Sequence, residues 1–393
     1  MSRKIVAVLL VVSMVLVGVL APGCEPTDET IDIGGIFCLT GDLAFMGVLI
    51  SQAAQLAVED INDAGGVLGK NLTIKIEDSA TNPAVAFTAY KKLAEVNGVE
   101  VIVGPMISGA VMASGNYAAV EQVPMVSPSA TSPLITNMTS TQWALRTCTF
   151  DDWQGEVLAN KAISEGYNTS AILVVDNAYG IGIELVVTDI LEAANVTIEE
   201  TIRYDQATGT YLTELGLIVA ADPDVIFHCG YHGDSAVIYE QAAGLGLNAT
   251  PWLVAEGVYG MPGETYPAAL AFMEDAPLLG CTLAVDPASS EWPAYVAFNA
   301  SYVARWGEEP SVYCDTVYDA VQLIALAIED AGVYEGAAIK DSLYDVGVAY
   351  SGASGPVTFD ANGDRTSATY AIWDVLYDGE DYNYVHLEYI PFP

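Results

Sequence analysis

The chain has 393 residues, of which 52% are hydrophobic, and its 51 acidic and 12 basic residues give a formal net charge of -39. This hydrophobic fraction excludes a disordered acidic tail, and the length allows two domains, each with its own core. The negative field excludes nucleic acid as a partner, because phosphate binding needs clustered Lys and Arg side chains.

The first segment, residues 1–24, is a predicted targeting segment. Two basic residues precede an apolar run from Ile5 to Leu20, which is shorter than a membrane-spanning helix prefers and fits a secretory signal. Its end resembles a lipoprotein leader, in which Cys24 becomes the lipid-bearing first residue. The alternative is an uncleaved N-terminal anchor helix. Both interpretations place the body outside the cytoplasm, tethered to the membrane by an acidic linker at residues 25–30.

The body alternates predicted strands and helices, which indicates βαβ units, parallel sheets and an α/β fold. So many units would crowd one sheet, so we expect two Rossmann-like lobes, with a crossing in the turn-rich stretch 136–150. At the C-terminus, strands at 356–359 and 368–377 and a turn at 378–381 lead to a hairpin strand at 384–390. The other expected strands are 31–39, 72–77, 99–103, 123–126, 171–175, 197–204, 225–227, 252–254 and 279–285. The expected helices are 49–63, 83–96, 109–121, 153–165, 181–194, 211–221, 235–245, 295–306 and 315–331.

Five of the predicted strands end in a turn that carries a lone polar group. Open α/β sheets bind ligands beyond the carboxyl ends of their strands, so these groups are candidate ligand contacts. Four hydroxyls and one carboxylate suit a small zwitterion, and they contain no nucleophile–base pair. The pattern therefore favours a binding protein over an enzyme. The five residues are Ser108, Thr131, Tyr179, Tyr231 and Glu256.

Other motifs have structural interpretations. The Tyr-Gly-Ile-Gly run at 179–182 lacks the third glycine of a dinucleotide fingerprint, and no cofactor is expected. His228 and His232 are four residues apart, but His228 belongs to a predicted strand, so the two do not share the i, i+4 face of a helix and no metal site is predicted. The cysteines beyond Cys24 are odd in number, widely spaced and mostly within apolar runs. This favours buried free thiols and leaves one disulfide as the alternative.

Short motifs from about Thr30 to the C-terminus occur in an order that is similar to one known family. They are LTGD at 39–42, AVEDIN at 57–62 with GG at 65–66, VGP at 103–105, SPSAT at 127–131, DNAYG at 176–180, GYH at 230–232, AEG at 255–257, and GPVTFD at 355–360 with GD at 363–364. This order resembles the type I periplasmic binding proteins of ABC importers, and most closely the branched-chain amino-acid (Leu/Ile/Val) branch. The resemblance implies two lobes joined by three crossings, one formed by 31–146 and 283–366, the other by 147–282 and 367–393.

The resemblance also implies roles for the candidate residues. Ser108 and Thr131 stand where the family's hydroxyls hold an amino acid's α-carboxylate, and Ser129 offers backbone groups beside them. Tyr179, Tyr231 and Glu256 stand where the opposite lobe binds, with Glu256 receiving the α-ammonium. Met46 falls where an aromatic residue often borders the cleft. The expected protein is a monomer without a cofactor that delivers an amino acid to an ABC importer permease.

Three alternatives to an amino-acid receptor remain at this point. The same fold accommodates a receptor for amides, urea or another small polar solute, for which a buried acid at position 256 is unnecessary. A ligand-sensing ectodomain is a second alternative, although the sequence contains no second transmembrane segment. An exported hydrolase is the third, but it lacks a recognisable nucleophile–base arrangement.

Overall fold

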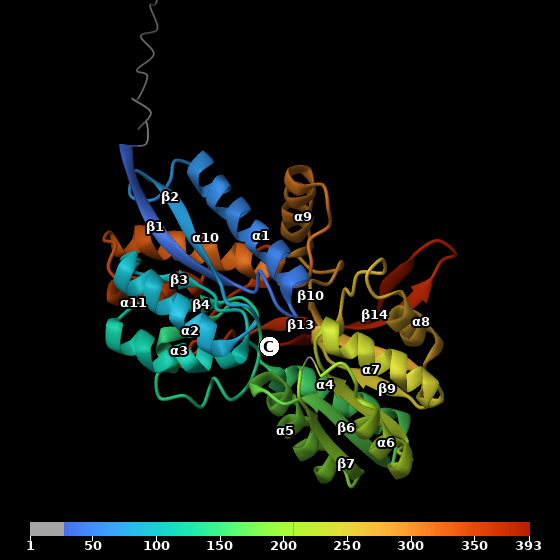
Figure 1. Cartoon of the computed structure of the whole chain (residues 1–393). Coiled ribbons are helices and arrows are strands. Elements are labelled where there is room, and N and C mark those ends of the chain that lie inside the picture. Colours follow the sequence, from blue (N-terminus) through green and yellow to red (C-terminus); the bar gives the residue numbers. More distant parts are fainter. Residues whose placement is uncertain (1–26, 207) are drawn as a thin grey trace, which may run out of the picture.

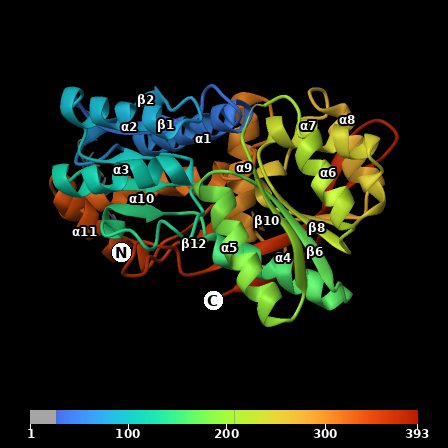
Figure 2. The ribbon, with the colours of Figure 1, turned by 60° about the horizontal axis from the view of Figure 1, so that its bottom comes forward.

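Two separate sheets organise the chain into two lobes that lie side by side in both views of the ribbon (Figure 1, Figure 2). The computed structural model describes residues 27–206 and 208–393. The predicted targeting segment and its Cys24 lie outside the described residues and stay a prediction.

The first sheet has five strands, and all of its pairings are parallel. Its strand order is β2 (Lys70–Asp78), β1 (Thr27–Phe37), β3 (Ile102–Val103), β4 (Met125–Ser127) and β5 (Ala144–Arg146). Helices α1 (Ala44–Asp63), α2 (Pro83–Lys91), α3 (Ser108–Glu121), α9 (Trp292–Trp306), α10 (Cys314–Ala331) and α11 (Gly336–Gly347) belong to this half; α1 packs against α10, and α10 against α11. Its short elements are η1 (Lys92–Val96), η2 (Thr141–Trp143), β11 (Ser351–Gly352) and β12 (Gly355–Pro356).

The second sheet has seven strands and mixes directions, because its last two strands form an antiparallel hairpin. Its order is β14 (Tyr382–Phe392), β13 (Ala368–Tyr377), β10 (Leu278–Ala284), β9 (Trp252–Val254), β8 (Val225–Cys229), β6 (Thr169–Val175) and β7 (Thr197–Tyr204). The helices of this half are α4 (Asp151–Glu165), α5 (Ala178–Ala193), α6 (Leu212–Ala221), α7 (His232–Gly244) and α8 (Pro267–Asp275), with short turns η3 (Leu247–Ala249) and η4 (Glu256–Val258).

The chain passes between the two sheets three times: after β5, after β10 and before β13. Two buried arginines hold these passages together. Arg146 at the end of β5 pairs with Asp364, and Arg365 donates to the carbonyl oxygen of Thr147 at 2.8 Å. Buried guanidinium groups need such partners, because an unpaired charge in the interior is costly. Residues distant in sequence thus form one junction between the lobes.

The structure corrects several boundaries. β1 begins at Thr27, so Thr27–Thr30 pair with β2 in the sheet rather than belonging to the linker 25–30; the ion pair between Glu29 and Lys70 accompanies this pairing. β10 ends at Ala284 within the second sheet, beyond the expected lobe boundary at 283. The predicted strand 356–359 is wrong after Pro356, because Phe359 makes only an isolated bridge with Arg365.

The elements that were not predicted are the strands β5 and β11, the helices α8 and α11, and the short turns η2, η3 and η4. β5 has three residues inside the turn-rich crossing, and α8 has only nine, too few to show helical periodicity against its apolar neighbours. In α11, however, Ile339, Ser342 and Leu343 are buried at the i, i+3, i+4 spacing of an amphipathic helix. That pattern was present in the sequence and was overlooked.

Burial explains both the state of the cysteines and the apolar composition of α1. The cysteines at 38, 148, 229, 281 and 314 are buried free thiols, which confirms the favoured interpretation over a disulfide. Among the described residues α1 alone is long and apolar enough to cross a membrane, but 61% of its most apolar window is buried against the rest of the fold. It is a core helix.

Candidate ligand-binding site between the lobes

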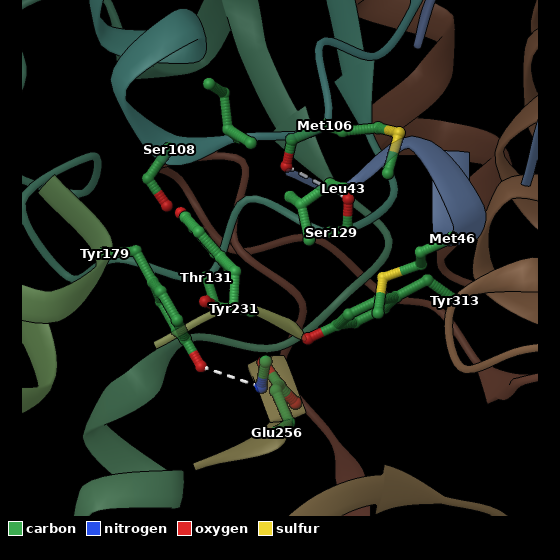
Figure 3. A pocket seen from close by; sticks show the side chains of 12 residues that line it. Leu43, Met46, Met106, Ser108, Ser129, Thr131, Tyr179, Tyr231, Glu256 and Tyr313 are labelled. Carbon is green, nitrogen blue, oxygen red and sulfur yellow. Dashed lines mark hydrogen bonds between the residues drawn. The ribbon is translucent and has the colours of Figure 1, made fainter. Parts of the chain in front are cut away.

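All seven predicted site residues line one cavity between the lobes, with about 390 Å³ of free space. Figure 3 shows Ser108 and Tyr179 on one side of it, Glu256 at its base, and Met46 with Tyr313 on the opposite side. The predicted residues are Met46, Ser108, Ser129, Thr131, Tyr179, Tyr231 and Glu256; the lining residues not predicted are Leu43, Met106, Ile107, Gly257 and Tyr313.

The wall from the first lobe carries hydroxyl groups at the start of α3. Ser108 is the first residue of this 14-residue helix and is buried, so the positive end of the helix dipole lies at the wall. The Ser108 Oγ accepts a hydrogen bond from the backbone N–H of Ser132 at 3.2 Å, which leaves its own proton available to a ligand. The Ser129 Oγ donates to the Met106 carbonyl oxygen at 3.0 Å, so this residue presents backbone groups to the cavity.

Thr131 lines the cavity and also contacts a buried acid. Its hydroxyl donates to the Asp151 Oδ2 at 3.0 Å, and a hydroxyl has only one proton to donate. The expected donation to a ligand carboxylate stays a prediction, and it requires this hydroxyl to exchange Asp151 for the ligand. The oxygen of Thr131 keeps acceptor capacity, which suits an ammonium rather than a carboxylate.

The wall from the second lobe is a stacked pair of tyrosines. The rings of Tyr179 and Tyr231 lie 5.6 Å apart at an interplanar angle of 13°. Asn177 joins them: its Nδ2 donates to the Tyr231 hydroxyl at 3.3 Å, while its Oδ1 caps α5 by accepting from the backbone N–H of Tyr179. The N-cap thus fixes the position of a residue that lines the cavity.

Gly257 lets the segment that carries Glu256 approach the wall formed by Tyr179 and Tyr231. A Cβ at Gly257 would lie 2.2 Å from the Gly230 carbonyl oxygen, a distance that real side chains do not adopt. The backbone N–H of Gly257 donates to the Tyr179 hydroxyl at 3.1 Å (Figure 3). Glu256, immediately before it, is consequently held beside the two tyrosines.

Glu256 is a buried carboxylate whose two oxygens have no hydrogen-bond partner within the described part of the chain. Burial raises the pKa of its carboxyl group to about 7, because the charged form loses its water. Such a group is costly in an empty site and is stabilised when a cation enters.

A second buried acid, Asp151, is the main site residue that the sequence analysis missed. It is the first residue of α4, and its Oδ1 has no partner among the described residues. Burial and the neighbouring Glu256 raise the pKa of Asp151 well above its ordinary value. Gln154, one turn later, accepts from the backbone N–H of Glu256 at 3.2 Å. Glu256, which lines the cavity, and Asp151, which lies behind Thr131, are therefore neighbouring carboxylates, and neither forms an ion pair within the described residues.

The remaining wall is apolar. Leu43 and Met46 come from the start of α1, and Met106 and Ile107 from the loop before α3, and all four are buried. Tyr313, which adopts a left-handed backbone conformation at φ 71° before α10, closes the far side. A left-handed backbone conformation is uncommon for a tyrosine, and here it places the side chain at the cavity.

The lobes touch beside this cavity. The Gln206 Nε2 of the second lobe donates to the Asp42 Oδ2 of the first at 3.2 Å, and the rings of Phe45 and His232 lie 6.4 Å apart. The Ser132 Oγ donates to the Ala178 carbonyl oxygen at 2.6 Å. The structure therefore has a closed arrangement, in which a bound solute would be shielded from water.

Gly180, His228 and His232 have packing and hydrogen-bond roles in the structure. A Cβ at Gly180 would lie 2.1 Å from the Val175 carbonyl oxygen, so this glycine permits close helix–strand packing. His228 is hydrogen-bonded to the Leu173 carbonyl oxygen and the Ser235 Oγ, and His232 to the Tyr259 carbonyl oxygen. Across residues 27–206 and 208–393, no group of three or more His, Cys, Asp or Glu is placed to hold a metal ion.

Two α/β lobes, three connections and one polar cavity between them define a two-lobed solute-binding protein. The model of the periplasmic binding protein family matches residues 30–380, and the chain belongs to this family, in its type I fold. A relative from Rhizobium johnstonii, the Leu/Ile/Val-binding protein BraC3, is 30% identical over 348 residues, which cover 87% of this chain and 91% of the relative.

Two solved structures are similar over nearly the whole chain. The leucine-binding protein LivK of Thermotoga maritima gives a TM-score of 0.81 at 23% identity and covers 92% of this chain and 98% of its own. The branched-chain amino-acid transporter substrate-binding protein LivJ of Streptococcus pneumoniae, solved with isoleucine, gives 0.77 at 26% identity and covers 91% of this chain and 100% of its own. The predicted α/β fold class and family are confirmed.

Proposed function

We propose that this protein binds an apolar amino acid, of the branched-chain class, between its lobes outside the cytoplasm and delivers it to an ABC importer permease, without catalysis. The observation that carries the proposal is the pairing of Glu256 and Asp151. Glu256 lines the cavity, Asp151 is buried behind the lining residue Thr131, and both carboxylates retain unpartnered oxygens within the described residues. An α-ammonium group supplies the charge and the three N–H donors that such a pair needs.

The opposite charge of the ligand fits the wall around Ser108. An α-carboxylate accepts from the free proton of the Ser108 hydroxyl, from backbone groups near Ser129 and from the N-terminus of α3. Thr131 is assigned to the boundary between the two charges of the ligand. Its oxygen accepts a hydrogen bond from the ammonium while its O–H group continues to donate to Asp151. Both charges of a zwitterion then exchange water for matched partners.

The side chain of the ligand is assigned to the apolar wall. Leu43, Met46, Met106 and Ile107 offer no charged group, so burying an aliphatic side chain there is favourable by about 25 cal/mol per Å² of apolar surface. The printed name of the Rhizobium relative, a Leu/Ile/Val-binding protein, supports the same class of ligand.

Closure links binding to delivery. Ser108 and Glu256 belong to different lobes, so a ligand that contacts both favours the closed arrangement over the open one. A permease that recognises the closed form thereby accepts loaded protein in preference to empty protein.

A thermal-shift panel of the twenty amino acids, with acetamide and urea added, tests this proposal. We expect leucine, isoleucine or valine to raise Tm the most. Two analogues separate the charge contacts: 3-methylbutylamine lacks the carboxylate of leucine, and 4-methylpentanoate lacks its ammonium, so neither should match leucine. Stabilisation by acetamide or urea, with none by any amino acid, would instead support the polar-solute receptor.

A further inference from the structure

A second cavity lies on the other side of the segments that line the amino-acid cleft. It has about 610 Å³ of free space and is lined from both halves of the molecule. Tyr259 follows the turn that carries Glu256, and Asp315 lies two residues after Tyr313, so two segments serve both cavities. We call this second cavity the aromatic cavity. The residues that line it are Tyr259, Leu283, Ala284, Val285, Trp292, Tyr295, Phe298, Pro310, Ser311, Val312, Asp315, His386 and Tyr389.

Aromatic rings dominate the lining of the aromatic cavity. Trp292 and Tyr295 at the start of α9 stack with ring centroids 5.2 Å apart. Tyr259 and Tyr389 stand on either side of His386, whose two ring nitrogens hydrogen bond to their hydroxyls at 3.0 and 3.1 Å. Burial lowers the pKa of His386, so this imidazole adds no positive charge near neutral pH.

The charge that remains in the lining is Asp315. Within the described part of the chain its carboxylate accepts one hydrogen bond, from the backbone N–H of Thr316 at 2.9 Å. The buried Arg365 makes no hydrogen bond to Asp315, because its Nη1 and Nη2 groups donate to Thr147 and Ser354, but its charge lowers the pKa of Asp315. Burial and the neighbouring Asp319 outweigh that effect and raise the pKa of Asp315 to about 6.

We propose that the aromatic cavity is a second binding site and that it takes a small organic cation of the quaternary ammonium type. Aromatic faces attract such a cation through their quadrupoles, and the methyl groups of the cation bury apolar surface against the same rings. Asp315 serves as its counter-ion at the N-terminus of α10. A hydrated inorganic cation makes poor use of the rings, and an anion meets the carboxylate without a basic partner among the lining residues.

This site is separate from the amino-acid cleft, because none of its lining residues also lines that cleft. The cation is therefore expected to bind when the cleft is filled. This independence distinguishes the proposal from binding of the same cation at the two carboxylates Glu256 and Asp151.

Choline and its uncharged carbon isostere, 3,3-dimethyl-1-butanol, provide a matched pair of probes. We expect isothermal titration of the protein saturated with leucine to show choline binding and at least tenfold weaker binding of the alcohol. Asp315→Asn and Trp292→Ala should each weaken choline at least tenfold. Glu256→Gln, compared with the original protein in titrations without leucine, should leave choline unaffected. If leucine gives no signal, the same titration is run without it, so that failure of the proposed amino-acid function does not hide this result.

Four outcomes would overturn the proposal: no binding of choline, equal binding of the alcohol, displacement of choline by equimolar sodium, or loss of choline binding in Glu256→Gln alone. Circular dichroism and leucine titration of the Asp315→Asn and Trp292→Ala proteins establish that they are folded. Should Trp292→Ala fail to fold, Trp292→Phe keeps an aromatic face and is expected to retain most of the choline affinity.

Discussion

The Thr131 hydroxyl donates its single proton to the Asp151 carboxylate across 3.0 Å, in the interior of the cleft. This hydrogen bond ties a residue of the first lobe to the first turn of α4 in the second half of the molecule. It also commits the threonine oxygen to accepting, which is the role that an ammonium group needs.

Replacement of Asp151 by asparagine tests this arrangement. We expect Asp151→Asn to weaken amino-acid binding by about 1.5–3 kcal/mol, the range for a hydrogen bond to a charged group. Isothermal titration calorimetry measures the change. The adjacent Asp152 is exposed, so Asp152→Asn is the matched control and should bind like the unchanged protein. Equal affinity in the two variants would remove Asp151 from the ammonium site.

Glu256 should matter more, because both of its carboxylate oxygens lack a partner at hydrogen-bond distance among the described residues, although Tyr313 and Gln154 lie near enough to lower the pKa of the group. Truncation in Glu256→Ala leaves the buried ammonium short of a partner, and we expect a loss of about 3–5 kcal/mol in binding free energy. Calorimetry with the best ligand of the panel gives the value. The exposed Glu264 supplies the control substitution Glu264→Ala. Affinity within twofold of the original would reject the assignment of the ammonium to Glu256.

Ser108 offers a milder test at the carboxylate end. Removal of its hydroxyl in Ser108→Ala should cost about 1.5–3 kcal/mol of affinity. Ser114 lies in the same helix and is equally buried but does not line the cleft, so Ser114→Ala controls for packing in α3. Titration of leucine and of 4-methylpentanoate adds a second check. An unchanged dissociation constant for leucine in Ser108→Ala would place the carboxylate elsewhere.

The sequence was sufficient to predict which polar residues line the cavity, where those residues follow strands. Ser108, Thr131, Tyr179, Tyr231 and Glu256 all come after apolar runs, and parallel strands bring their carboxyl ends together, so these positions converge in one cavity. The motif order supplied Met46 and Ser129 in addition. Parallel strands of this fold class end at the same edge of the sheet. A pattern of apolar runs followed by polar residues therefore predicted which residues, distant in sequence, lie together.

Two of the residues that were missed, Asp151 and Tyr313, do not follow predicted strands. Asp151 begins a helix after the turn-rich crossing, and its role depends on Thr131 and Glu256, which are 20 and 105 positions away. The paired acids Asp151 and Asp152 at the start of a predicted helix were the one local signal. Tyr313 precedes α10 in a left-handed conformation that its sequence does not indicate. Contacts of this kind follow from tertiary packing and not from periodicity.

Binding should depend on pH in the neutral range. The raised pKa of Glu256, about 7, means that the ligand-free carboxyl holds a proton for part of the time at neutral pH and for most of the time below it. An ammonium needs the ionised form, so binding must release that proton. Asp151, whose pKa is also raised, must lose its proton as well to accept from the ammonium. Apparent affinity should therefore fall as pH drops below 7, by at most tenfold per pH unit for each carboxyl that releases a proton.

Calorimetry from pH 5.5 to 8.5 in buffers of different ionisation enthalpy measures this release directly. Proton release should be largest at low pH, where both buried carboxyls hold protons, and should decrease as the pH rises. Glu256→Gln should lose most of the dependence along with most of the affinity. A flat profile, with no exchange of protons at any pH, would show that neither buried carboxyl changes its protonation on binding.

The junction between the lobes gives a prediction for stability instead of binding. Arg146 is fully buried, pairs with Asp364, and donates to the Ala130 and Ser132 carbonyl oxygens at 3.2 and 2.9 Å. Replacement in Arg146→Met keeps much of the volume but leaves Asp364 without its cation, so we expect a loss of about 3–5 kcal/mol in the free energy of unfolding. Urea denaturation of the ligand-free protein measures it.

Arg305 supplies the control for that experiment, because its ion pair with Glu59 is roughly half exposed to solvent. An exposed pair contributes about 0–1 kcal/mol, so Arg305→Met should change the unfolding free energy little. If Arg146→Met were as stable as Arg305→Met, the buried pair would contribute nothing net, and packing of the crossings alone would hold the junction. A loss confined to Arg146→Met assigns the stability of the junction to the charge that joins the end of β5 to the segment before β13.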